Sequence, residues 1–226
     1  MDIIPQLIVN SIIAGAIYTL IALGFNLIYG TVKFFDLGYG ALATVGGYSV
    51  FLFYKELGFN LYLSVLIALL ITGLIGVLLN WCIYEPLRRR KASSMVLLVA
   101  SLGVLTMLQA IIAILFTSQF QTLTRNSGVQ RVFEINGAVI TGTQTIILVT
   151  GLLIMAGLAL LLHYTRFGKE IRAISDDEEV AKIVGINTSY VVSGVFFIGS
   201  AIAGFAGALI GFDTGIEPTM GLSLLL

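Results

Sequence analysis

The chain has 226 residues, of which 58% are hydrophobic and 11% are charged, and its 12 basic and 12 acidic side chains leave a formal net charge of zero. Soluble domains carry about 25% charged residues, so this composition excludes an ordinary water-facing surface and predicts a lipid bilayer as the surroundings. The neutral balance gives no basis for binding nucleic acid. The single cysteine, Cys82, excludes an internal disulfide, and the sequence has no Cys/His spacing typical of a metal site.

Six stretches without a charged residue follow one another, at 3–32, 37–54, 57–84, 92–124, 135–165 and 183–212. A helix needs about 20 apolar residues to cross about 30 Å of hydrocarbon, and five of the stretches exceed that length. The stretch 37–54 has 18 residues and four glycines, which predicts a short, broken or re-entrant element. The sequence therefore predicts an all-α, polytopic transmembrane helix bundle of about six spans, one of them short and glycine-rich, plus the start of another. We expect a single transmembrane domain over residues 1–226.

The basic residues predict an orientation. If every stretch crosses once, nine Lys and Arg residues lie on one side and three on the other, and an excess of Lys and Arg marks the cytoplasm. Residues 165–189 are then a cytoplasmic loop, while the amino terminus and residues 118–142 lie outside. The amino terminus lacks the basic region and cleavage site of a signal peptide, so the first stretch is kept as a span. Within the outer loop, residues 129–140 fit both a small hairpin around Asn136–Gly137 and a plain surface loop.

Small residues recur every four positions in the last long stretch. This pattern is typical of closely packed helices, either at the core of a translocation bundle or a subunit interface, or as ordinary packing within a membrane protein. The two stripes are Gly199, Ala203, Gly207 and Gly211, and beside them Ser200, Gly204 and Ala208.

The charged segment 166–187 predicts a short helix with defined ends. Ser175 is suited to be the N-cap, with Glu178 three residues later as in a capping box, and Gly185 stands where a left-handed cap ends a helix. Val180 and Val184 lie four residues apart and give the helix an apolar side. Such a helix suits docking into a groove on another protein. The alternative is a connector on the membrane surface, against which its acidity argues, because cytoplasmic leaflets attract basic segments.

The spacing Glu179-x-Ala181-x-x-x-Gly185 resembles the EAA loop of ABC-importer permeases, with Val180 in place of the first alanine of that pattern. The resemblance implies a coupling helix that inserts into an ATPase subunit. The residues that it implies for ATPase coupling are Asp177, Glu178, Glu179, Val180, Ala181, Lys182, Val184 and Gly185.

A longer resemblance covers nearly the whole chain. Residues 15–30 and 35–48 resemble the amino-terminal signature of LivH-type permease subunits of the branched-chain amino acid ABC transporter family, with further matches at 101–103, 166–173, 184–187 and 217–221. That family also includes urea and short-amide permeases. The resemblance implies a permease subunit of an ATP-driven importer that forms part of the translocation path for branched-chain amino acids. A permease for urea or short amides is the alternative, and an ATP-independent secondary carrier is a more distant one.

The resemblance also implies partners and a location. These are a second, LivM-like permease, two ABC ATPase subunits and a periplasmic solute-binding protein, in the inner membrane of a bacterium. The chain has no Gly-x-x-x-x-Gly-Lys-Ser/Thr motif, so ATP hydrolysis is expected on separate subunits, and we expect no enzymatic activity or cofactor of its own. Family members continue for several tens of residues, so this chain is expected to be truncated at its carboxyl end.

Polar residues within the predicted spans are the candidates for the translocation path. Such residues either touch the transported solute or hydrogen-bond between helices. No charged residue lies near the middle of a predicted span, so the coupling-ion site of a secondary carrier is not apparent. The candidates are Tyr18, Asn26, Asn80 and Gln109.

Overall fold

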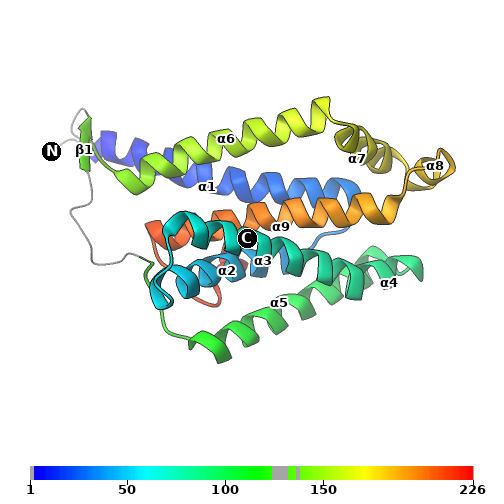
Figure 1. Cartoon of the computed structure of the whole chain (residues 1–226), viewed down its shortest axis with the longest axis horizontal. Helices are drawn as coiled ribbons and strands as arrows, with labels where there is room; N and C mark the ends of the chain where they lie inside the picture. The colour runs from blue at the N-terminus through cyan, green and yellow to red at the C-terminus, as the bar shows by residue number, and fades with distance from the viewer. Residues whose placement is uncertain (1–2, 124–131, 136–137, 226) are drawn as a thin grey trace.

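The computed structural model describes residues 3–123, 132–135 and 138–225. Its long helices lie roughly along one axis (Figure 1). Within these residues, five helical runs are long and apolar enough to cross a membrane, which confirms the predicted all-α membrane bundle. They are α1 (Ile3–Val32), α3 (Leu61–Leu79) with its continuation, α5 (Ser94–Phe116), α6 (Gly142–Tyr164) and α9 (Thr188–Asp213).

The continuation of α3 contains a change in helix type. After α3 the helix passes through a π-helical segment, η2 (Asn80–Tyr84), into α4 (Glu85–Arg89). The N–H of Glu85 donates to the carbonyl of Asn80, five residues back, and Pro86 follows with no N–H to offer. A proline inside a helix removes a ladder hydrogen bond, and π-helical segments are where such helices bend.

The glycine-rich stretch forms the short helix α2 (Gly38–Val50) and a π-helical extension, η1 (Phe51–Glu56). At about 1.5 Å per residue α2 is too short to cross the hydrocarbon alone. All but one of its 13 residues are buried. It packs against α9, α3 and α5, so the predicted short element is an internal part of the bundle rather than a peripheral one.

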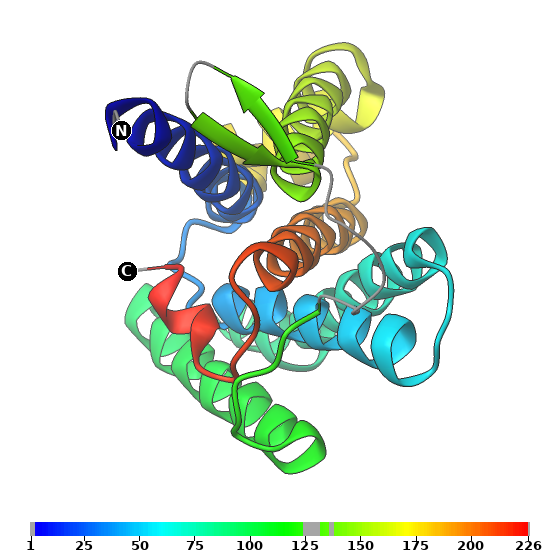
Figure 2. The ribbon, with the colours of Figure 1, turned by 90° about the vertical axis from the view of Figure 1, so that its left-hand side faces the viewer.

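Helix α9 lies at the centre, with α1 and α6 on one side and α2, α3 and α5 on the other (Figure 2). Both small-residue stripes of α9 are buried within the chain. A methyl group on Gly46 would collide with the backbone of Gly204, and one on Gly207 with the backbone of Ala43. The stripes therefore bring α2 and α9 into backbone contact, so they pack helices within this chain rather than against another subunit.

The two ends of the bundle differ. One end carries α4, α7 (Arg166–Asp176) and α8 (Glu178–Ile183), and the other carries the start of α1 and a hairpin (Figure 1). The hairpin pairs β1 (Val132–Ile135) with β2 (Ala138–Thr141) in antiparallel register, Ile135 opposite Ala138. This confirms the hairpin alternative, although Asn136 and Gly137 themselves lie outside the described residues. The short helix α10 (Met220–Ser223) packs on α2.

Candidate functional site

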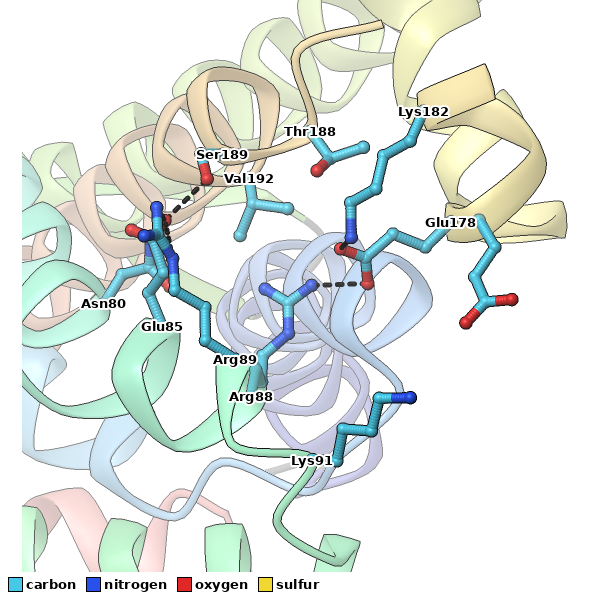
Figure 3. Close-up of a pocket in the computed structure, with 11 residues that line it drawn as sticks. Asn80, Glu85, Arg88, Arg89, Lys91, Glu178, Lys182, Thr188, Ser189 and Val192 are labelled. Carbon is cyan, nitrogen blue, oxygen red and sulfur yellow. Dashed lines mark hydrogen bonds and ion pairs between the residues drawn. The ribbon is translucent and has the colours of Figure 1, made fainter. Parts of the chain in front are cut away.

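A cavity of about 500 Å³ opens at the end of the bundle that carries α4 and α8 (Figure 3). Its walls come from the η2–α4 run with the turn that follows it, from α8, and from the first turns of α9. Its lining residues are Asn80, Glu85, Arg88, Arg89, Lys91, Glu178, Glu179, Lys182, Thr188, Ser189 and Val192.

The amino end of α8 is capped by Asp177, whose carboxylate accepts the N–H groups of Glu179 at 2.8 Å and Val180 at 3.0 Å. The prediction that Ser175 is the N-cap is therefore wrong. Helix α7 buries Ile171 and Ile174 against the bundle and continues through Ser175 to Asp176. The chain becomes extended only at Asp177, so that residue takes the cap position.

The carboxyl end of α8 follows the sequence prediction. Gly185 has φ +93°, in the left-handed region that residues with a β-carbon disfavour. The N–H of Gly185 donates to the carbonyl of Lys182, and the N–H of Ile186 donates to the carbonyl of Ala181 at 3.0 Å. This pair of bonds is the Schellman arrangement, which satisfies the last carbonyls of the helix and reverses the chain toward α9.

Helix α8 presents apolar side chains outward. Ala181 is 3% exposed and anchors the helix on the bundle, whereas Ile183 is 84% exposed. Val180 and Val184 are also exposed. Exposed apolar side chains at the tip of a bundle form a surface suited to a protein partner.

An ion pair between Glu178 and Arg88 holds α8 to α4, and the same carboxylate also pairs with Lys182 within α8. Glu178 binds Arg88 at 2.7 Å through one carboxylate oxygen and Lys182 at 2.9 Å through the other. Partial burial of Glu178 raises its pKa, but the hydrogen bonds and charges of Lys182 and Arg88 outweigh this and bring the pKa below its ordinary value. On the same α4 segment, Glu85 accepts hydrogen bonds from Ser189 of α9 and from Arg89. The segment thus contacts both α8 and α9.

The structure places the candidate path residues in three separate regions. Asn80 is buried and lines the same cavity as the coupling candidates Glu178, Glu179 and Lys182. Its side-chain amide donates to Ser193 at 3.3 Å, while its Oδ1 has no hydrogen-bond partner among the described residues.

The other three candidates lie elsewhere. Tyr18 is 54% exposed, and Asn26, on the same helix, is exposed as well. Gln109 lines a second cavity, of about 340 Å³, with Glu217 and Thr219. The four candidates therefore do not line one path within this chain.

Among the residues that the structure describes, one charged side chain lies in the interior, and sequence reasoning did not place it there. The charge pattern predicts a linker at Asp36, yet only 2% of this residue is exposed, and its Oδ1 accepts a hydrogen bond of 2.7 Å from the hydroxyl of Tyr84. Asp36 lies between two apolar stretches, and the glycines that follow at 38 and 40 were the available signal that the linker re-enters the bundle.

Comparisons with known proteins point in the same direction. The family model described as "Branched-chain amino acid transport system / permease component" matches residues 7–226. The high-affinity branched-chain amino acid transport system permease protein BraD of Pseudomonas aeruginosa is 28% identical over 228 residues, which cover 96% of this chain and 74% of BraD. LivH of Salmonella typhimurium is 28% identical over 229 residues, 96% of this chain and 73% of LivH.

A probable branched-chain amino acid transport permease protein LivH from Methanocaldococcus jannaschii is 28% identical over 215 residues, 94% of this chain and 68% of that protein. No solved structure matches the chain. The family model covers nearly the full length, and the chain folds as a multi-pass helix bundle with an acid-capped helix at one end. The chain therefore belongs to the family of permease components of branched-chain amino acid transport systems.

Proposed function

We propose that this chain is the membrane subunit of an ATP-driven importer for branched-chain amino acids, and that α8 is its coupling helix. The observation that carries the proposal is the build of α8: Asp177 caps its start, Gly185 ends it, and Ile183 and its neighbours project outward. A rigid helix with an apolar outer face fits a groove on an ATPase subunit.

The contacts behind α8 support its role in transmitting motion. Glu178 ties it to Arg88 of α4, and only residues 184–187 separate it from the central helix α9. A displacement of α8 by an ATPase therefore reaches two elements of the bundle. A difference in the contacts of α8 between nucleotide states of the ATPase would supply the free energy that shifts the bundle.

The distribution of basic residues at this end of the molecule supports the proposed orientation. The basic residues 88–91 and those of α7 lie at the end that carries α8, and this supports placing that end, with residues 165–189, in the cytoplasm. Residues 118–142 and the amino terminus then face the periplasm of a bacterial inner membrane. A periplasmic solute-binding protein would deliver the solute there.

The translocation path is proposed to lie between this chain and a second, LivM-like permease. Tyr18 and Asn26 project from α1 away from the bundle. Polar side chains at membrane depth are stabilised by protein partners or by water rather than by lipid. Gln109 and Asn80 each line a cavity open to the surface, so both also remain candidates for contact with the solute.

The test is reconstitution of this chain in proteoliposomes with its second permease, two ATPases and a loaded binding protein. We expect ATP-dependent uptake of leucine, isoleucine and valine. Uptake of urea or a short amide in their place would favour the alternative substrate, and uptake that persists without ATP would favour a secondary carrier.

Gly185→Val tests the coupling helix. No heavy atom lies within 4 Å of the position of an added β-carbon, so only the left-handed φ opposes the valine. We expect the left-handed cap at the carboxyl end of α8 to be disrupted and uptake to cease, while the amount of membrane-inserted chain stays unchanged. Gly157→Val, on the exposed side of α6, is the control. Normal uptake by Gly185→Val would contradict the assignment of α8.

A further inference from the structure

A carboxylate is buried between α1 and α2. Asp36 makes no ion pair with any described residue, although it is almost fully inaccessible. Its side chain accepts hydrogen bonds from the hydroxyl of Tyr84 and from the backbone N–H groups of Gly38 and Tyr39, at the start of α2. Burial of an unpaired carboxylate is costly, so a role beyond filling space is expected for it.

Tyr84 is held as firmly as its partner. It is fully buried, and its ring packs between Phe34 at 5.0 Å and Phe196 at 5.6 Å, measured between ring centroids. It is the last residue of η2, two residues before Pro86. The Tyr84 hydroxyl therefore marks where the start of α2 is attached to the η2–α4 run.

The residues that follow Tyr84 contact α9 and α8. Glu85 binds Ser189 at the first turn of α9, and Arg88 binds Glu178 of α8. One five-residue run, 84–88, thus contacts the starts of α2 and α9 and the coupling helix. The π-helical segment η2, which ends at Tyr84, interrupts the α-helical ladder between α3 and α4, and such an interruption is where a helix bends most easily.

Helices α2 and α9 are in direct backbone contact. Their backbones touch at Gly46 with Gly204 and at Ala43 with Gly207, and no side chain between them can yield. A force applied at Asp36 is therefore carried along α2 to the centre of the bundle, since closely packed interiors transmit strain.

We propose that the hydrogen bond between Asp36 and Tyr84 transmits the displacement of the coupling helix, through Arg88 and α4, to the central pair of helices α2 and α9. Asp36 and Tyr84 are then positioning residues for transport. This proposal rests on the proposed function, in which α8 receives the stroke of the ATPase.

The experiment compares Tyr84→Phe with the wild type in the reconstituted complex and measures solute taken up per ATP hydrolysed. Removal of the hydroxyl takes away the bond to Asp36 and leaves the ring packing in place. We expect uptake per ATP to fall at least about tenfold, because a hydrogen bond to a charged group is lost. The amount of assembled complex and its basal ATP hydrolysis should not change. Tyr62→Phe, at an exposed position at the start of α3, is the control.

Two further variants separate transmission from packing. Asp36→Asn keeps an acceptor for Tyr84 and for the N–H groups of α2, so it should keep at least about half of the uptake per ATP. The double variant Asp36→Leu with Tyr84→Phe replaces both partners with apolar groups, which often restores stability. It should assemble and remain uncoupled.

Wild-type uptake per ATP in Tyr84→Phe or in the double variant overturns the proposal. So does a loss of uptake that only follows a loss of assembled complex, since that assigns the pair to packing alone. If the wild-type complex itself fails to import amino acids with ATP, the proposed function fails. If the wild type imports and Gly185→Val does not, while Tyr84→Phe behaves as wild type, only this inference fails.

Discussion

The backbone contact between α2 and α9 makes a direct prediction about Gly46. In Gly46→Ala the added methyl group would collide with the backbone of Gly204. A backbone atom cannot move aside by changing rotamer, and Thr72 of α3 lies against Gly204 from another direction. Helix α9 is therefore confined between α2 and α3 and cannot retreat from the methyl group without disturbing a second interface.

The size of the effect follows from these contacts. Overpacking a well-packed interior costs about 1–3 kcal/mol, and the confinement of α9 places this variant at the upper end, about 3 kcal/mol. The higher helix propensity of alanine offsets about 1 kcal/mol of that cost. The net loss of about 2 kcal/mol corresponds to a midpoint of thermal unfolding about 4–8 °C lower, using the scaling for chains of 150–250 residues.

The assay is thermal unfolding of the purified chain in detergent, followed by the fraction that stays monodisperse after heating. Gly157→Ala is the matched control, since no heavy atom lies within 4 Å of the added methyl group. Helix propensity alone should raise its midpoint by about 2–4 °C. If Gly46→Ala and Gly157→Ala shift the midpoint in the same direction, the backbone contact between α2 and α9 does not hold the bundle together.

Three further predictions concern α8. Asp177→Ala removes the acceptor for the N–H groups of Glu179 and Val180, so it should destabilise the helix by about 1 kcal/mol and reduce uptake. Asp177→Asn keeps a side-chain oxygen at the cap and should retain both the helix stability and the uptake. Uptake assays compare the two variants. Glu178→Gln should lower the free energy of unfolding at pH 7 by about 1 kcal/mol. This is less than a buried charged hydrogen bond contributes, because 35% of the Glu178 side chain is exposed and water screens the ion pair. Since the Glu178 pKa is lowered in the folded state, its contribution is present above the unfolded value of about 4.3 and is lost as the pH falls through the folded pKa. Unfolding midpoints of wild type and Glu178→Gln should therefore converge once the pH has fallen below the lowered folded-state pKa of Glu178, and a difference that persists in strong acid would contradict the ion-pair account. Ile183→Ser should weaken binding of the ATPase in a pull-down without changing the unfolding midpoint, because the side chain is 84% exposed; a lowered midpoint would show that Ile183 packs within the chain.

Local sequence was sufficient for several features of this protein. The long spans follow from uninterrupted apolar length, because a bilayer accepts backbone only when each segment satisfies its own hydrogen bonds. The end of α8 at Gly185 follows from a conformation that only glycine adopts without strain. The hairpin strands were one of two alternatives, and a short Asn–Gly turn favours them.

The start of α8 shows where local rules reach their limit. Ser175 and Asp177 are both good cap residues, and the sequence rule for a capping box favours Ser175. Burial of Ile171 and Ile174 against the bundle extends α7 past Ser175 and moves the cap to Asp177. Tertiary packing thus chose between two locally acceptable ends.

The sequence by itself determined that this chain spans a membrane many times and carries a short capped helix at one end, since both properties depend on residues that are neighbours along the chain. The tertiary structure decided that Asp36 is interior, that α2 is central, and that Asn80 lies in the cavity behind α8. Asp36 and Tyr84 are 48 residues apart, Arg88 and Glu178 are 90 apart, and Asn80 and Ser193 are 113 apart. Contacts over such separations exist only once the helices have packed, and no local pattern encodes which polar groups meet.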